Sequence, residues 1–255
     1  MIELLPHEKR KITTVVMDFD GTLSTLRCGW ENVMAPLMED YLGRDEETRQ
    51  KIRRYIDEST GIQTIEQMKW LCREALLANP DAPSDPWFYK KEYNDRLMQN
   101  VAKKREDAKV HPEDYRIAGS EAFLKALKDR GLCLLAASGT DEEDVRKEAA
   151  ALGLAGYFDE IAGALPHSEN CSKEATLRRL LFESGSGDGI LVIGDGPVEI
   201  HLGRVSGALT LGVASNETER RGYNDAKVRR LEKAGAHAIT DCFENLNEIL
   251  AWMEE

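Results

Sequence analysis

Thr13-Thr14-Val15-Val16-Met17-Asp18-Phe19-Asp20-Gly21-Thr22-Leu23 is the stretch of sequence that decides the fold. Its first five residues are β-branched or apolar, which predicts a short strand of a parallel sheet that is buried on both faces. Gly21 marks a turn directly after the strand. Ligands of open parallel sheets collect at the carboxyl ends of the strands. The stretch therefore predicts that Asp18 and Asp20 lie at a binding edge of the sheet.

The chain beyond this strand shows two different patterns. From about Gly29 to His111, apolar residues recur at helical spacing and no convincing strand is present. From Ser120 onward, predicted strands alternate with predicted helices. The strands are at 132–138, 159–163, 190–194, 208–213 and 236–240, and the helices are at 120–130, 141–152, 172–183, 197–206, 225–234 and 243–253. This alternation is typical of an α/β protein with a doubly wound parallel sheet. We expect a core of residues 1–23 and 114–255, with a helical domain of residues 24–113 inserted after the first strand.

The composition excludes several classes of partner. The 255 residues include 46 acidic and 34 basic ones, which gives a net charge of −12. Such a surface repels nucleic acid and anionic membranes, so neither is expected as the main partner. The amino-terminal residues form no leader, and no apolar run approaches the ~20 residues of a membrane span. We therefore expect a cytoplasmic protein, and the composition leaves its oligomeric state open.

Three predicted strands end in polar clusters. Asp18 and Asp20 follow the first strand, Ser138-Gly139-Thr140 follows the next, and Gly194-Asp195-Gly196 follows the strand at 190–194, with Glu199 close behind. Each cluster alone is explained by turn chemistry, because Gly, Ser and Asp favour strand-to-helix turns. Three such ends at one edge of one sheet indicate a binding site.

These motifs resemble those of the haloacid dehalogenase-like (HAD) superfamily. Asp18-Phe19-Asp20-Gly21-Thr22-Leu23 looks like its first motif, Ser138-Gly139-Thr140 is similar to its second, Lys173 lies where its third falls, and Gly194-Asp195-Gly196-Pro197-Val198-Glu199 resembles its fourth. The inserted helical domain stands where the type I cap of the family stands. One departure is Glu199, since the fourth motif often ends in Asp. The resemblance implies a Rossmann-like HAD core with an α-helical cap domain, similar to phosphoglycolate phosphatase-like or sugar-phosphatase members.

The resemblance also implies a role for each motif residue. Asp18 would attack phosphorus and carry the aspartyl-phosphate, while Asp20 would protonate the leaving oxygen and then deprotonate the hydrolytic water. Mg²⁺ would be bound by Asp18, the backbone carbonyl of Asp20 and Asp195, with Glu199 holding a coordinated water. The phosphoryl oxygens would be bound by Ser138, Gly139 and Lys173.

The residue types suit this chemistry. Carboxylates beside a phosphate dianion repel one another in a dry cleft, and a divalent cation with oxygen ligands relieves the repulsion. Family members that cleave carbon–halogen bonds lack the second Asp, because a halide needs no proton. The presence of Asp20 therefore favours phosphate transfer.

Substrate specificity is assigned to the inserted domain. The turn at Thr60, Gly61 and Gln63 resembles in position the substrate-specificity loop of type I caps, and Arg27 is placed to pair with an anionic group of the substrate. The alternative interpretation is an ordinary helix–helix turn together with a surface arginine.

The expected function is a Mg²⁺-dependent phosphatase, a HAD-like phosphoric monoester hydrolase, acting on a small phosphorylated metabolite such as a sugar phosphate or a phosphoglycolate-like compound. A phosphomutase of the same fold, or a catalytically silent phosphate-binding protein, is the alternative. A P-loop kinase is excluded because no GxxxxGK[ST] run is present. A dinucleotide oxidoreductase is disfavoured because no GxGxxG follows the first strand.

Overall fold

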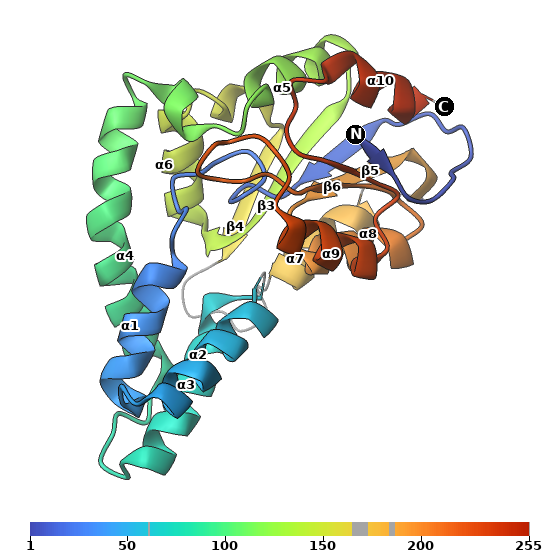
Figure 1. The fold of residues 1–255 in the computed structure, drawn as a ribbon. Coiled ribbons are helices and arrows are strands. Elements are labelled where there is room, and N and C mark those ends of the chain that lie inside the picture. Colours follow the sequence, from blue (N-terminus) through green and yellow to red (C-terminus); the bar gives the residue numbers. More distant parts are fainter. Residues whose placement is uncertain (61, 165–172, 184–186, 255) are drawn as a thin grey trace. The chain divides into compact units, whose positions relative to one another are not determined.

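The structure is a computed structural model that describes residues 1–60, 62–164, 173–183 and 187–254. The chain divides into two compact units (Figure 1). The first consists of Met1–Cys28 and Lys104–Glu255, and the second of Gly29–Lys103. The chain therefore leaves the first unit after its first long strand and returns to it later.

The first unit is built on a mostly parallel sheet, which confirms the predicted α/β fold. In the described residues the strand order is β1-β7-β6-β5-β2-β3-β4. The strands are β1 (Ile2–Glu3), β2 (Thr14–Met17), β3 (Cys133–Asp141), β4 (Glu160–Ala164), β5 (Ile190–Gly194), β6 (Leu209–Val213) and β7 (Ala238–Thr240). Strand β2 pairs in parallel with β3 and with β5, so the predicted first strand lies inside the sheet. The short β1 pairs antiparallel with β7 and had not been predicted.

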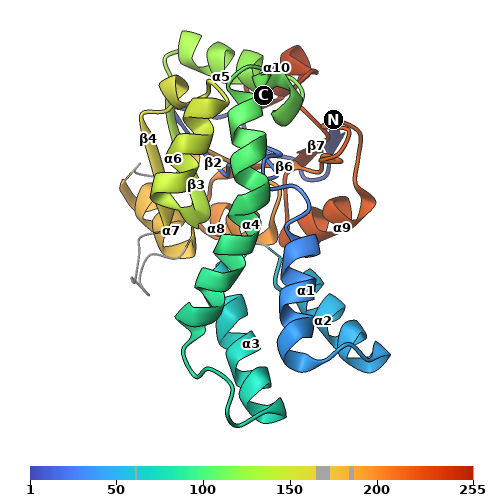
Figure 2. The same cartoon turned by 90° about the vertical axis from the view of Figure 1, so that its left-hand side faces the viewer.

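Helices cover both faces of this sheet, as Figure 2 shows from the side. They are α5 (Ser120–Asp129), α6 (Glu142–Ala151), α7 (Lys173–Glu183), α8 (Pro197–Val205), α9 (Asp225–Ala234) and α10 (Leu246–Glu254). Val15 packs in one apolar core with Phe123 of α5, Val145 of α6 and Ile249 of α10. Its neighbour Val16 packs in another core with Leu177 of α7. Because successive side chains of a strand point to opposite faces, a strand covered on both sides must be apolar throughout, as β2 is.

The second unit is helical and has a core of its own. Helices α1 (Glu31–Leu42), α2 (Glu46–Glu58) and α3 (Thr64–Ala78) belong to it, and α4 (Pro86–Ala108) begins in it. Its buried apolar residues include Met34, Leu37, Met68, Leu71 and Tyr89. Among the described helices of the chain, none has the length and the apolar character needed to cross a membrane.

A buried histidine, His237, lies directly before β7. The side chain of His237 is 4 % exposed. Thr210 donates its backbone N–H to Nδ1 of His237 at 3.1 Å, and the guanidinium of Arg204 contacts Nε2. Burial, followed by the charge of Arg204, lowers the pKa of His237 to about 4.

We predict that acid weakens the fold through His237. Between pH 6.5 and pH 4, His237 binds a proton in the unfolded chain but not in the folded chain. Its contribution to stability is therefore complete above pH 6.5 and is lost as the pH falls. From pH 7.5 to pH 5 the free energy of unfolding should fall by about 2 kcal/mol on this account. Urea unfolding at the two pH values measures this free energy. In His237→Gln its fall between pH 7.5 and pH 5 should be smaller than in wild type by that amount. The exposed His111 gives the control, because His111→Gln should behave as wild type. An equal fall in all three proteins would contradict the assignment.

Candidate active site

Two neighbouring strands deliver carboxylates to one edge of the sheet. Asp18 directly follows β2, and its backbone N–H donates to the carbonyl of Ile193 in β5 at 2.8 Å. Asp195 directly follows β5, and Glu199 lies in the first turn of α8. Parallel pairing of β2 with β5 therefore brings together residues that are far apart in the sequence.

The three side chains form a carboxylate cluster. One carboxylate oxygen from each of Asp18, Asp195 and Glu199 lies within 4.8 Å of the others. Asp18 is 2 % exposed and Glu199 is fully buried. Carboxylates this close and this buried repel one another unless a cation or a proton intervenes. An all-oxygen donor set is the one that Mg²⁺ or Ca²⁺ prefers.

Glycines make the close approach of these carboxylates possible. Gly21 has φ +77°, and a Cβ on it would lie 2.3 Å from Oδ2 of Asp195. A Cβ on Gly194 would lie 2.1 Å from Cγ of Glu199. The Oε1 atom of Glu199 accepts the backbone N–H of Gly196 at 2.7 Å, which also caps the start of α8. Side chains at these glycine positions would thus disrupt the cluster, which explains the residue type there.

Asp20 is held by hydroxyl groups from β3. Ser138 Oγ and Thr140 Oγ1 both donate to Oδ2 of Asp20, each at 2.9 Å. Ser138 Oγ in turn accepts the backbone N–H of Thr140 at 2.9 Å. The sequence predicted Ser138 and Gly139 as phosphate ligands at the end of a strand, whereas the structure continues β3 through Asp141. The contact of Thr140 with Asp20 had not been predicted.

Lys227 of α9 was also missed, and no feature of the sequence around it indicated a role. Its ammonium group lies 2.7 Å from Oδ2 of Asp195 and 2.7 Å from Oε1 of Glu217, and the residue is 5 % exposed. Burial lowers the pKa of Lys227, but the two carboxylates outweigh it and raise the pKa above its usual range. Lys227 therefore provides a fixed positive charge beside the carboxylate cluster.

Arg27 lies among carboxylates of the first unit. Its Nη2 donates to Oε1 of Glu148 at 2.6 Å and its Nε donates to Oε2 of the same residue at 3.1 Å. Nε also lies 3.8 Å from Oδ1 of Asp20, and Nη2 lies 4.0 Å from Oδ2 of Asp144. Burial raises the pKa of Glu148 above its usual range, and the charge of Arg27 opposes that shift. The sequence placed Arg27 near the site but gave no indication of Glu148.

The remaining predicted residues lie elsewhere or outside the described part. Lys173 is the first residue of α7, and its side chain is not among those described; Gly61 also lies outside the described residues. Thr60 and Gln63 belong to the second unit, between α2 and α3. Thr60 Oγ1 donates to the carbonyl of Ile56 at 2.9 Å, and Gln63 is 8 % exposed at the start of α3.

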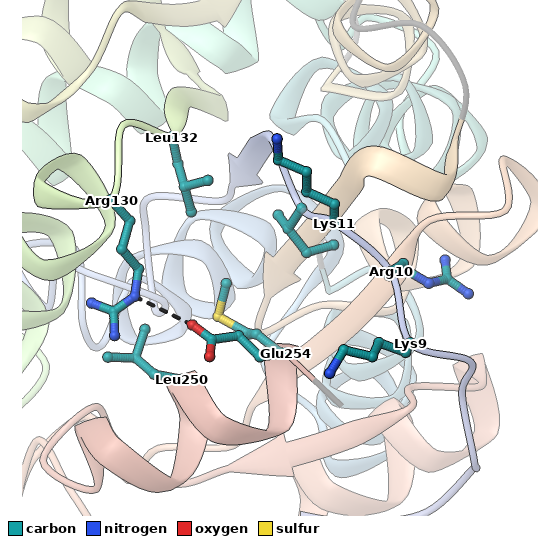
Figure 3. A pocket seen from close by; sticks show the side chains of 9 residues that line it. Lys9, Arg10, Lys11, Arg130, Leu132, Leu250 and Glu254 are labelled. Carbon is teal, nitrogen blue, oxygen red and sulfur yellow. Dashed lines mark ion pairs between the residues drawn. The ribbon is translucent and has the colours of Figure 1, made fainter.

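A separate cavity of about 580 Å³ is lined in part by residues that directly precede β2 (Figure 3). Lys9, Arg10 and Lys11 line it together with Arg130, which forms an ion pair with Glu254 at 3.6 Å. These residues precede β2, whereas Asp18 follows it. None of the residues that line this cavity is a candidate site residue, so it plays no part in the site described above.

Solved structures with the same fold cover nearly the whole chain. A structure described as a predicted phosphatase from Clostridium acetobutylicum has a TM-score of 0.66 and 18% identity, over 94% of this chain and 99% of that one. A β-phosphoglucomutase from Clostridium difficile has a TM-score of 0.68 and 14% identity, over 95% and 97% of the two chains. A predicted phosphoglycolate phosphatase from Haemophilus somnus 129pt has a TM-score of 0.61 and 18% identity, over 94% and 98%. At these identities the similarity establishes the fold alone.

The sequence itself gives the family. A comparison with curated proteins finds no significant match. The family model of the haloacid dehalogenase-like hydrolases, however, matches residues 12–207, which include every residue of the carboxylate cluster and the hydroxyl groups around Asp20. The chain therefore belongs to the haloacid dehalogenase-like hydrolases, as its motifs had led us to expect.

Proposed function

We propose that the chain is a Mg²⁺-dependent phosphatase that hydrolyses a small phosphate monoester, a sugar phosphate or a phosphoglycolate-like compound, through an aspartyl-phosphate on Asp18. The observation that carries the proposal is the different surroundings of two nearby carboxylates. Asp18 belongs to the buried carboxylate cluster, whereas Asp20 is hydrogen-bonded to two hydroxyl groups. Two carboxylates in different surroundings can take the roles of nucleophile and of acid and base.

In the proposed reaction an oxygen of Asp18 attacks phosphorus, and the bond between phosphorus and the ester oxygen breaks. Asp20 gives its proton to the departing oxygen, which leaves as the alcohol. Asp20 then takes a proton from the water that attacks the phosphorus of the aspartyl-phosphate, which restores Asp18 and releases inorganic phosphate. Thr22 supports Asp18 by donating its hydroxyl to Oδ2 of Asp18 at 3.2 Å.

The carboxylate cluster fits Mg²⁺ in the chemistry of its donors. Asp18 and Asp195 would ligate the ion with the backbone carbonyl of Asp20, and Glu199 would hold a coordinated water. Bound there, the ion supplies positive charge that offsets the repulsion between the phosphate and these carboxylates. The backbone around Ser138 and Gly139, together with Lys173, is proposed to bind the phosphoryl oxygens, because the one hydroxyl proton of Ser138 is donated to Asp20.

A phosphomutase is the second candidate. Solved structures with this fold include a β-phosphoglucomutase as well as phosphatases, so the fold is compatible with either reaction. The two reactions share the aspartyl-phosphate and differ in whether water or a substrate hydroxyl receives the phosphoryl group. A catalytically silent phosphate-binding protein is disfavoured, because Asp18, Asp20 and Asp195 are all present at one edge.

A panel of phosphorylated metabolites, assayed with Mg²⁺, tests the proposal. We expect stoichiometric release of inorganic phosphate from a subset of sugar phosphates or phosphorylated short-chain acids. Product analysis by ³¹P NMR distinguishes the candidates, since a mutase would yield an isomeric ester with little free phosphate. Turnover of no ester on the panel, with phosphate bound all the same, would support the silent protein instead.

A further inference from the structure

Arg27 and Glu148 form a buried ion pair that the proposed reaction does not yet use. The Glu148 side chain is fully buried and that of Arg27 is 14 % exposed. Two parallel contacts, at 2.6 and 3.1 Å, join them. Such a two-pronged arrangement fixes the plane of the guanidinium, because both ends of the fork are bound.

The guanidinium fixed in this way faces one oxygen of Asp20. Oδ2 of Asp20 accepts both hydroxyls of β3, while Oδ1 is buried and accepts no hydrogen bond from the described residues. Nε of Arg27 lies 3.8 Å from Oδ1. That distance is too long for a hydrogen bond but short enough for the guanidinium charge to attract the carboxyl oxygen in a partly buried place. The two oxygens of Asp20 therefore meet different partners, hydroxyls on one side and a positive charge on the other.

Stability alone is a weak reason for such a pair. Removing two charges from water carries a large desolvation cost, and apolar residues of similar volume are often at least as stabilising. The pair also joins α6 to the segment directly after the first motif, within one compact unit. Its position next to Asp20 is thus the feature that needs a functional explanation.

We propose that Arg27, held by Glu148, is a positioning residue for Asp20. The charge of Arg27 on the Oδ1 side and the hydroxyls of Ser138 and Thr140 on the Oδ2 side fix the rotation of the carboxyl group. The carboxyl group is thereby held in the one orientation that faces the leaving oxygen, and its other rotamers are not populated. This inference rests on the proposed phosphatase function, and it assigns Arg27 to the acid step rather than to substrate recognition.

A series of ring-substituted phenyl phosphates tests whether Arg27 positions Asp20 for proton donation. The ratio kcat/KM covers only the steps up to departure of the phenol, so it reports proton donation by Asp20 and is blind to the later attack of water. Phenyl phosphate has a poor leaving group that needs the proton, whereas 4-nitrophenyl phosphate has a good one. We expect Arg27→Gln to lower kcat/KM at least about tenfold for phenyl phosphate and less than about threefold for 4-nitrophenyl phosphate.

Two further variants separate positioning from general support of the fold. Arg116 is a matched control, since it is 12 % exposed, forms an ion pair with Glu121 and donates to the carbonyl of Leu152 at 2.8 Å. Arg116→Gln should leave the dependence on the leaving group as in wild type. In an Asp20→Asn background, Arg27→Gln should cause almost no additional loss, because residues that act through one group are not additive.

The possible results distinguish the inference from the proposed function. An equal loss on all esters, or full additivity with Asp20→Asn, would overturn the positioning role while the phosphatase stands. If Arg27→Gln fails to give a cooperative melting transition, Glu148→Gln replaces it, because it keeps the volume and one acceptor but releases the guanidinium. That variant should show the same leaving-group dependence to a smaller degree, and its absence would equally overturn the inference. A wild-type protein that hydrolyses none of these esters and none of the metabolite panel overturns the proposed function, and the inference with it.

Discussion

Asp18→Asn should abolish phosphate release, with a loss on the order of 10⁴-fold or more, and should leave the fold intact. An amide does not attack phosphorus, so the covalent route is closed. The replacement has nearly the same shape, and its side-chain oxygen can still accept the hydroxyl of Thr22 that Asp18 accepts at 3.2 Å. Removing one charge from a cluster with Asp195 and Glu199 also relieves repulsion, so the variant should melt no lower than wild type.

Acid-quench labelling makes this test independent of steady-state rates. Wild type incubated with a ³²P-labelled ester and Mg²⁺ should carry label on the protein that is stable in acid and released by hydroxylamine, as expected for an acyl phosphate. Asp18→Asn should carry none. Asp129→Asn is the control, because Asp129 lies on the surface in an ion pair with Lys125. Substantial turnover by Asp18→Asn, checked by mass spectrometry for reversion to Asp, would rule out the covalent mechanism.

Removal of divalent metal should have an effect of similar size. We expect EDTA to abolish activity, Mg²⁺ to restore it, and Ca²⁺ to inhibit. The larger and more flexible coordination shell of Ca²⁺ would loosen the in-line arrangement that octahedral Mg²⁺ enforces. Because the carboxylate cluster is the proposed site, Asp195→Asn should weaken Mg²⁺ binding at least about tenfold in isothermal titration calorimetry.

The calorimetric measurement needs no substrate and therefore stands apart from the choice of ester. Asp159→Asn is a suitable control, since Asp159 pairs with Lys128 at 2.9 Å and lies outside the carboxylate cluster. Full activity in the presence of chelator would contradict the metal dependence. Unchanged Mg²⁺ affinity in Asp195→Asn would instead show that the ion binds outside this cluster.

Much of the first unit could be predicted because its signals are local. The apolar run of β2 and the alternation after residue 120 gave the α/β fold with element limits mostly within a few residues of those observed. The motif at 138–140 was harder. Ser, Gly and Thr are typical of turns, but the strand resumes after an irregularity and Asp141 pairs with Ala164 of β4. Here sheet pairing prevailed over local preference.

The supporting contacts of the site could not be predicted, because they join distant segments. Arg27 contacts Glu148, which stands 121 residues later in the sequence, and Lys227 reaches Asp195 from a helix after β6. A single charged residue in a sequence of many gives no indication of its partner. The specificity roles of Thr60, Gly61 and Gln63 stay predictions, since they depend on how a substrate meets the second unit.

The division of the first unit into two separated stretches has a consequence for biosynthesis. Thr14 pairs with Cys133 on one side and with Ile190 on the other, so β2 is translated long before either of its neighbouring strands. The second unit, whose core lies within residues 29–103, is complete on the ribosome long before that. Until β5 has emerged, the apolar Val15-Val16-Met17 segment has an unpaired edge that invites association with other nascent chains. Folding of the nascent chain should thus begin with the second unit, and β2 should be the segment that most needs protection by chaperones.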